Sequence, residues 1–133
     1  MRLYLDTNAI IFAHEGPPGI QAKVVECVIE TCLTPGGLAM TSLISRLECR
    51  VRPLRDQNLR LLSLYDSMFG KSGLRVEPIS ADIIERATQL RADHSFRTPD
   101  AIHLATAIQC RADLFLTGDK ALARCPGLHV EII

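Results

Sequence analysis

The sequence predicts an α/β fold in which a mostly parallel sheet carries helices on both faces. Short apolar runs bounded by turn residues alternate with longer stretches in which apolar residues recur every three or four positions. No repeat, linker or low-complexity segment interrupts this alternation. The length of 133 residues suits one domain with a substantial core, so residues 1–133 should form a single domain.

The first third of the chain should contain one strand and two helices. Leu3–Leu5 is a short apolar run, and Asn8–His14 follows it with helical spacing. The sequence Gly16-Pro17-Pro18-Gly19 should end that helix. From Ile20 to Cys32 the apolar residues again keep a helical period, and a turn is expected over residues 34–37.

The middle third should contain one strand and two further helices. Leu38–Thr41 is the expected strand, and Thr41 or Ser42 can cap the next helix, which should stop at Pro53. A longer helix is expected over Leu54–Phe69, followed by a turn at Gly70–Gly73. The first of these two helices should bury one apolar face, made of Leu43, Ile44, Leu47 and Val51.

The last third begins with the alternating segment Leu74–Ile79, a strand, after which Ser80 should cap a helix. Thr98-Pro99-Asp100 begins another helix, with Thr98 as the cap and Pro99 at the first position. Apolar residues continue almost all round that helix, which should therefore be the most buried one. The remaining elements are a strand at Leu114–Thr117, a short helix at Asp119–Arg124 and a strand at His129–Ile133.

Composition argues against several classes of protein. No apolar run approaches the roughly 20 residues needed to cross a bilayer, and Asp6 interrupts the apolar N-terminal segment, so we expect a cytoplasmic protein without a membrane partner. Five cysteines without Cys-x-x-Cys spacing should be small core residues rather than metal or redox groups. His103 is interpreted as a packed or capping histidine rather than a ligand.

The formal net charge is zero, which by itself argues against a nucleic-acid partner, but the basic residues are unevenly distributed. The chain has twelve Arg and only three Lys, and five of the arginines lie between positions 46 and 60. A guanidinium suits bidentate phosphate contacts. Arg46, Arg50 and Lys120 are therefore candidate phosphate contacts, and a solvated surface position is the alternative for each.

Four acidic residues stand where a divalent cation would be held. Asp6 and Asp119 each follow a predicted strand, and ligands of open α/β sheets bind at the carboxyl ends of strands. Glu48 and Asp100 lie near the starts of two helices. Singly, each acid has an ordinary explanation as a helix cap, a dipole partner or a surface ion pair. Gathered at one edge, the four carboxylates would repel one another unless a cation neutralised them.

The type of ligand indicates the chemistry. Carboxylates without His or Cys favour Mg²⁺ or Mn²⁺ over Zn²⁺, and such an ion can activate water for in-line attack on a phosphodiester. The four acids are thus the expected catalytic residues and metal ligands, and at least one should have a raised pKa without metal. Thr7, Asn8 and Thr117 are short polar residues beside the acids and should hydrogen-bond to them or position water.

Four segments resemble motifs of the PIN-domain family, in particular the toxin ribonucleases of VapBC toxin–antitoxin pairs. They are residues 5–8, Ser45–Glu48, Asp100–Ala107 and Thr117–Lys120, of which the third is the most specific. The resemblance spans nearly the whole chain. It implies a three-layer α/β/α sandwich and a Mg²⁺- or Mn²⁺-dependent endoribonuclease. It also implies a homodimer and a cognate antitoxin that blocks the site and, in complex, helps repress its own operon.

Two positions depart from the family pattern. Gly118 stands before the fourth acid where the family often has Asn, and Leu122 stands where an aromatic residue is frequent. Neither position carries a carboxylate, so these departures concern local packing more than catalysis.

Three other functions compete with a toxin. A phosphoaspartyl phosphatase normally has a second Asp two residues after the strand-end Asp, and here that position is Asn8. A solitary RNA-processing nuclease would use the same acids but would lack a neighbouring antitoxin gene. A non-catalytic module that binds RNA or protein is the third alternative, and the presence of all four acids argues against it.

Overall fold

The centre of the molecule is a five-stranded, fully parallel sheet with the strand order β3-β2-β1-β4-β5. The computed structural model describes residues 1–70 and 73–133. The strands are β1 (Arg2–Leu5), β2 (Leu38–Ser42), β3 (Leu74–Glu77), β4 (Leu114–Thr117) and β5 (Val130–Ile132). From β1 the strand order runs outward in both directions, so the switch point where such sheets bind ligands lies between β1 and β4.

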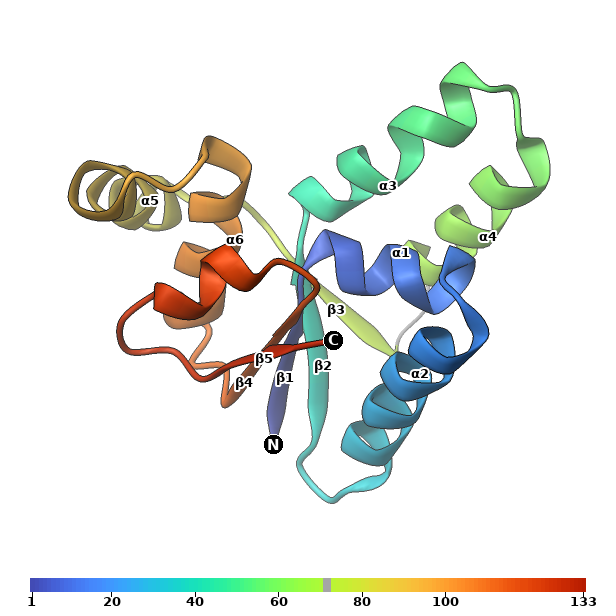
Figure 1. Ribbon diagram of the computed structural model, residues 1–133, viewed down its shortest axis with the longest axis horizontal. Helices are drawn as coiled ribbons and strands as arrows, with labels where there is room; N and C mark the ends of the chain where they lie inside the picture. The colour runs from blue at the N-terminus through green and yellow to red at the C-terminus, as the bar shows by residue number, and fades with distance from the viewer. Residues whose placement is uncertain (71–72) are drawn as a thin grey trace.

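Helices cover both faces of this sheet, as the alternating pattern predicts (Figure 1). They are α1 (Thr7–Glu15), α2 (Pro18–Leu33), α3 (Ile44–Arg55), α4 (Leu59–Gly70), α5 (Ala81–His94), α6 (Thr98–Gln109) and the 3₁₀ helix η1 (Lys120–Arg124). Successive residues of β1 serve opposite layers: Leu3 and Leu5 pack on the side of α1 and α2, and Tyr4 packs on the side of α5 and α6. The result is the expected three-layer α/β/α sandwich.

Helix α6 is the most buried helix, as its composition predicts. Every residue from Ala101 to Ala107 is buried, in the layer that α6 forms with α5. The helix begins one residue earlier than expected, because Arg97 is its N-cap and Thr98 its first helical residue. The expected cap at Ser80 is confirmed: its Oγ accepts a hydrogen bond of 3.2 Å from the backbone N–H of Ile83.

Helix α3 buries a different face from the one predicted. Leu43, Leu47 and Val51 are 46%, 60% and 47% exposed. The buried positions are instead Ser45, Cys49 and Pro53, which recur every four residues. This inner face packs against α1 and α4, and the apolar stripe faces solvent instead. Figure 1 shows α3 and α4 extending away from the sheet.

The boundary between α3 and α4 also differs from the prediction. Pro53 lies inside α3, which continues to Arg55, because a proline in the last turn removes only one hydrogen bond of the helix. The chain then turns through Gln57, whose φ is 55°, and the Asn58 side chain accepts a bond from Leu61 N at the start of α4. The single helix expected over Leu54–Phe69 is therefore shortened at its start.

Two further observations concern the chain as a whole. In the turn expected at Gly70–Gly73, Lys71 and Ser72 lie outside the described residues. Among the helices that the structure describes, none has the length and apolarity needed to cross a bilayer.

Candidate active site at the carboxyl ends of β1 and β4

The four predicted acids come from four different elements around the switch point. Asp6 follows β1 directly and caps α1, with its Oδ1 accepting a hydrogen bond of 2.8 Å from Thr7 N. Asp119 follows β4 and caps η1 in the same way, at 2.9 Å from Ala121 N. Both strand-end acids are therefore helix caps as well as members of the site. Asp100 lies in the first turn of α6, and Glu48 lies in α3.

Asp6 is the most buried of the four acids, with 4% exposure. Its second oxygen, Oδ2, accepts hydrogen bonds from Thr117 Oγ1 at 2.8 Å and from Asn8 Nδ2 at 3.2 Å. Burial raises the pKa of Asp6, and the negative charge of Asp100 adds to the rise, although His103, Thr117 and Thr7 oppose it. One acid with a raised pKa was expected, but repulsion between carboxylates is the smaller cause and desolvation the larger.

Asn8 and Thr117 join the ends of α1 and β4 across this site. Asn8 Oδ1 accepts a hydrogen bond of 2.7 Å from Gly118 N. A Cβ at Gly118 would lie 2.7 Å from Cε2 of Phe12, so this position has no room for the asparagine that the family often has. Leu122, the other departure, is 1% exposed and fills the core beside η1. Both departures thus have a packing explanation.

Glu48 is held by a buried histidine. His103 of α6 is 1% exposed, and its Nε2 lies 2.8 Å from Glu48 Oε1 and 3.5 Å from Asp6 Oδ1. Its Nδ1 lies 2.8 Å from the hydroxyl of Tyr4, a fully buried residue of β1. The expectation of a packed histidine is correct in its burial, but it missed that the ring contacts two of the four acids.

The partners of His103 assign its tautomer. A carboxylate only accepts hydrogen bonds, so Nε2 must carry a hydrogen. In the neutral ring, Nδ1 then accepts a hydrogen bond from the Tyr4 hydroxyl. Burial raises the pKa of Tyr4 well above its ordinary value, which keeps that hydroxyl protonated. With the ring neutral, the hydrogen bonds run in one direction, from Tyr4 through His103 to Glu48.

A second branch of hydroxyl groups reaches the same oxygen of Glu48. Thr7 Oγ1 donates to Glu48 Oε1 at 2.8 Å and lies 3.0 Å from Ser45 Oγ. Ser45 Oγ in turn lies 2.8 Å from Thr41 Oγ1, which donates to the backbone oxygen of Leu5. Both branches end on Oε1, and no described residue hydrogen-bonds to Oε2 of Glu48.

The pKa of Glu48 moves in the opposite direction to that of Asp6. Burial alone would raise it, but the hydrogen bonds and charge of His103, the hydrogen bond from Thr7 and the charge of Arg97 together lower it. The two acids that lie nearest His103 therefore have pKa values shifted in opposite directions, downward for Glu48 and upward for Asp6.

One strong cation faces the acids from outside the core. Arg97, the N-cap of α6, places its Nε 2.9 Å from Asp100 Oδ2. The hydrogen bond and charge of Asp100 raise the pKa of Arg97, and Asp119 and Glu48 contribute through their charges. The charges of three of the four acids thus act on one guanidinium.

The donor set suits a hard divalent cation. It consists of carboxylate oxygens from four elements, and a positive group already lies against one of them. Within residues 1–70 and 73–133, however, no three His, Cys, Asp or Glu side chains are arranged as a ready-made ligand set. Asp6, Asp100 and Asp119 are each engaged by a partner of their own, with which a bound ion would have to compete.

Comparisons with known proteins were made for both sequence and structure. The family model of the PIN domain matches residues 3–128. This chain belongs to the PIN-domain family. A comparison of the sequence with curated proteins found no significant match.

Three solved structures resemble the fold of this PIN domain closely. VapBC2 from Rickettsia felis, bound to a DNA fragment from the promoter, has a TM-score of 0.76 at 18% identity, covering 99% of this chain and 98% of that chain. A toxin–antitoxin complex from Klebsiella pneumoniae has a TM-score of 0.70 at 26% identity, covering 98% and 99%. VapC20 from Mycobacterium tuberculosis, a toxin that cleaves the sarcin–ricin loop, has a TM-score of 0.69 at 16% identity, covering 85% and 86%.

The sequence prediction for this PIN domain missed the residues that support its acids. They are Tyr4, Thr41, Ser45, Arg97 and His103. A signal for three of them was present, because each helix-borne acid has a polar residue three positions away, which lies on the same helical face. Ser45 precedes Glu48 by three, and Arg97 and His103 flank Asp100 by three on either side.

The three candidate RNA contacts have different surroundings. Arg46 and Arg50 of α3 pair with Asp66 of α4, at 3.6 Å and 2.9 Å. These ion pairs hold α3 against α4, so both arginines already have a structural role. Lys120 is exposed at the start of η1, directly after Asp119. Contact with RNA remains a prediction for all three.

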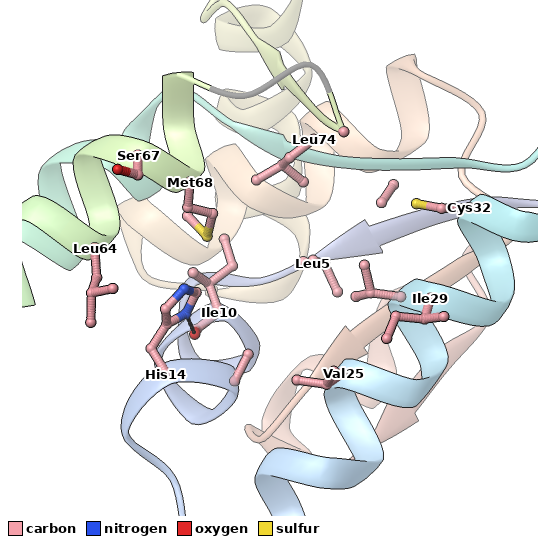
Figure 2. A pocket seen from close by; sticks show the side chains of 14 residues that line it. Leu5, Ile10, His14, Val25, Ile29, Cys32, Leu64, Ser67, Met68 and Leu74 are labelled. Carbon is pink, nitrogen blue, oxygen red and sulfur yellow. Dashed lines mark hydrogen bonds between the residues drawn. The ribbon is translucent and has the colours of Figure 1, made fainter.

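A second feature of the PIN domain is an apolar cavity of about 430 Å³ between α1, α2 and α4. Figure 2 shows Val25, Ile29 and Cys32 of α2 on one side and Leu64 and Met68 of α4 on the other. Among the described residues that line it, none is Asp, Glu, Lys or Arg. Val25, Ile29 and Leu64 are 38%, 50% and 48% exposed, so apolar side chains meet solvent here.

Proposed function

We propose that this PIN domain is a metal-dependent endoribonuclease that hydrolyses RNA phosphodiester bonds, and that it is the toxin of a type II toxin–antitoxin pair. The observation that carries the proposal is that one buried ring brings together two of the acids: His103 Nε2 lies 2.8 Å from Glu48 and 3.5 Å from Asp6, beside the switch point. The similar fold of a toxin that cleaves the sarcin–ricin loop supports RNA as the substrate class. A substrate of cellular RNA implies action in the cytoplasm.

The four acids would hold Mg²⁺ or Mn²⁺. Such an ion supplies an activated water and positive charge for a phosphodiester transition state. Asp6 is oriented by Thr7 N and Thr117 Oγ1, so one rotamer is kept beside the end of β4. Glu48 is fixed through Oε1, which leaves Oε2 directed to other ligands.

The neighbouring polar residues complete the site. Thr7 orients Glu48 through a hydrogen bond, and the hydrogen bond between Asn8 and Thr117 holds the start of α1 against the end of β4. Lys120 follows Asp119, is exposed, and would contact an RNA phosphate. Arg46 and Arg50 would contact RNA further along α3, with Asp66 limiting their freedom.

Replacement of Asp6 by Asn tests the mechanism. The variant keeps the side-chain shape but loses a charge, so the fold should survive and RNA cleavage in Mg²⁺ or Mn²⁺ should fall by two or more orders of magnitude, roughly 3 kcal/mol in activation free energy. Asp93→Asn, at an exposed position of α5, is the matched control and should cleave like the parent. Cleavage should stop when EDTA removes the metal. Equal rates for Asp6→Asn and the parent would show that the assigned mechanism is wrong.

Expression in a host cell separates the toxin from the other two candidates. The parent should arrest growth, Asp6→Asn should not, and co-expression of the neighbouring antitoxin gene should restore growth. Cleavage of RNA without growth arrest would favour a solitary RNA-processing nuclease. RNA binding without cleavage by the parent would favour a non-catalytic module.

We further propose that the antitoxin covers the cavity between α2 and α4. Two of the similar structures contain a toxin together with its antitoxin, which supports a protein partner of this kind. The mostly apolar lining of the described part of the cavity suits an apolar segment as the occupant. Ile29→Glu should weaken antitoxin binding without changing RNA cleavage, whereas Leu59→Glu, at a 74% exposed position outside the cavity, should change neither. Unchanged antitoxin affinity in Ile29→Glu would exclude this surface.

A second copy of the chain is the proposed partner of the exposed face of α3. Leu43, Leu47, Val51 and Leu54 form a continuous stripe there, and a two-fold axis would pack this stripe on its copy. Arg46 and Arg50 flank the stripe, but Asp66 offsets their charges. Light scattering should give twice the chain mass for the parent and for Leu59→Glu, and one chain mass for Leu47→Glu. A monomeric parent would refute the dimer.

A further inference from the structure

Arg97 is unusual among the basic residues of the described chain. Its Nε lies 2.9 Å from Asp100 Oδ2, and its side chain is 78% exposed. In residues 1–70 and 73–133, it is the only Arg or Lys that forms an ion pair with any of the four acids. It therefore lies between Asp100 and solvent.

Stabilisation of α6 does not explain this position. An acid in the first turn, such as Asp100, is favoured by the helix dipole, but a cation at the N-cap is disfavoured by it. An exposed pair three residues apart also contributes little to folding. The contact is therefore weak enough to exchange and is not needed to keep the fold.

The electrostatic surroundings explain the position better. Asp119 and Glu48 act on Arg97 in addition to Asp100, and Arg97 in turn helps to lower the pKa of Glu48. The guanidinium thus lies against Asp100 as a counter-ion, with Asp119 and Glu48 close enough to act on its charge. A monovalent group on a flexible stem cannot compete with a divalent ion that several carboxylates bind at once.

We propose that Arg97 is an exchangeable counter-ion: it neutralises Asp100 in the metal-free protein, leaves when a divalent cation binds, and then binds a phosphate group of the substrate beside the acids. This inference rests on the proposed nuclease function and adds a substrate-binding residue to it. Arg97 is the N-cap of α6, three residues before Asp100, so the released guanidinium stays near the acids. Its planar fork matches the geometry of phosphate oxygens. Metal binding would in this way prepare the site for RNA.

The first test measures metal binding without RNA. Calorimetry with Mn²⁺ should show that Arg97→Ala binds the ion about fivefold more tightly than the parent, as expected for removing one competing charge in a largely hydrated setting. Arg86→Ala is the matched control, because Arg86 is exposed on α5 and contacts none of the four acids. Equal Mn²⁺ affinity in the parent and Arg97→Ala would overturn the counter-ion role.

The second test measures binding of a single-stranded RNA oligonucleotide with and without a divalent ion, using Ca²⁺ to limit cleavage. With the ion present, Arg97→Ala should bind RNA about tenfold more weakly and should reduce the salt slope of log K by about 0.7, the value for one lost phosphate contact. Without the ion, Arg97→Ala and the parent should bind alike. Arg97→Lys should recover part of the loss. A loss of the same size in both conditions would show a permanent RNA contact and refute the exchange.

Cleavage assays separate failure of this inference from failure of the proposed function. At saturating Mn²⁺, Arg97→Ala should raise KM more than it lowers kcat. A parent that binds Mn²⁺ and RNA as described but never cleaves would refute the nuclease and leave the exchange of Arg97 intact. A parent that cleaves, with Arg97→Ala matching it in Mn²⁺ affinity and KM, would refute the exchange alone.

Discussion

Replacement of Tyr4 by Phe isolates the hydrogen bond that begins the path to Glu48. The Tyr4 ring is fully buried and stacks on Phe115, with centroids 5.0 Å apart and planes at 9°. Phenylalanine retains this packing, so no cavity forms and only the hydroxyl bonded to His103 Nδ1 is lost. A buried acceptor left without its donor costs about 1–3 kcal/mol. At about 3 °C per kcal/mol for a chain of this size, the unfolding temperature should fall by several degrees.

Tyr65→Phe provides a control with the same chemistry at a different place. Tyr65 is also fully buried, and its hydroxyl donates to Glu15 in the opposite layer, away from the four acids. Loss of that bond to a carboxylate should cost a similar amount, about 1.5–3 kcal/mol. The two variants should therefore lose comparable stability, and any difference in activity must come from the path through His103.

Activity should separate the two variants. If His103 orients Glu48, Tyr4→Phe should lower kcat for RNA cleavage on the order of tenfold, about 1.4 kcal/mol, with KM nearly unchanged. Tyr65→Phe should retain the kcat of the parent at a temperature where both variants are folded. The ¹⁵N resonance of His103 Nδ1 should shift in Tyr4→Phe only. An unchanged kcat in Tyr4→Phe, or an equal loss in Tyr65→Phe, would refute the positioning role of His103.

Three further predictions follow from the same geometry. The folded-state pKa of Asp6 is raised, so Asp6 contributes to stability below its ordinary pKa, and this contribution is lost as pH rises. The folded-state pKa of Glu48 is lowered, so Glu48 contributes to stability above its ordinary pKa, and this contribution is lost as pH falls. Thermal unfolding without metal, measured between about pH 3 and pH 7, tests both directions. As pH rises, the stability of Asp6→Asn relative to the parent should increase, and that of Glu48→Gln should decrease. The same trend in both variants would contradict the assignment. Burial raises the pKa of Cys49 to about 12 and leaves it 2% exposed, so maleimide followed by mass spectrometry should modify the exposed Cys32 and spare Cys49; early labelling of Cys49 would contradict the packing of α3. Gly118→Ala should cost about 1–3 kcal/mol by denaturant unfolding because its Cβ meets Phe12, whereas Gly19→Ala, in α2 with open space around it, should cost nothing; a harmless Gly118→Ala would show that the Phe12 ring moves freely.

Much of this fold follows from local patterns. A short apolar strand and an amphipathic helix differ in the period of their apolar residues, so the strands and helices could be placed from the sequence within a few residues. The position of Asp6 and Asp119 directly after strands was enough to bring them to one edge, because parallel strands end on the same side. The burial of α6 followed from its nearly continuous apolar content.

The inner face of α3 could not be predicted in this way. A helical period reveals an apolar stripe, but it does not reveal whether the fold covers that stripe or leaves it for a partner. Here the inner face carries Ser45 and Cys49, since Ser45 must reach Thr7 and Thr41. The leucines of α3 consequently lie outside.

By itself, the sequence determined the order of strands and helices, because each element depends on neighbours within a few residues, and it predicted the four acids of the proposed site. Only the tertiary structure decided how those acids are held. His103 lies 55 residues from Glu48 and 99 from Tyr4, yet one ring joins them. Hydrogen bonds between such distant residues are fixed by how helices cross a sheet, and hydrophobic periodicity contains no information about which polar groups then meet.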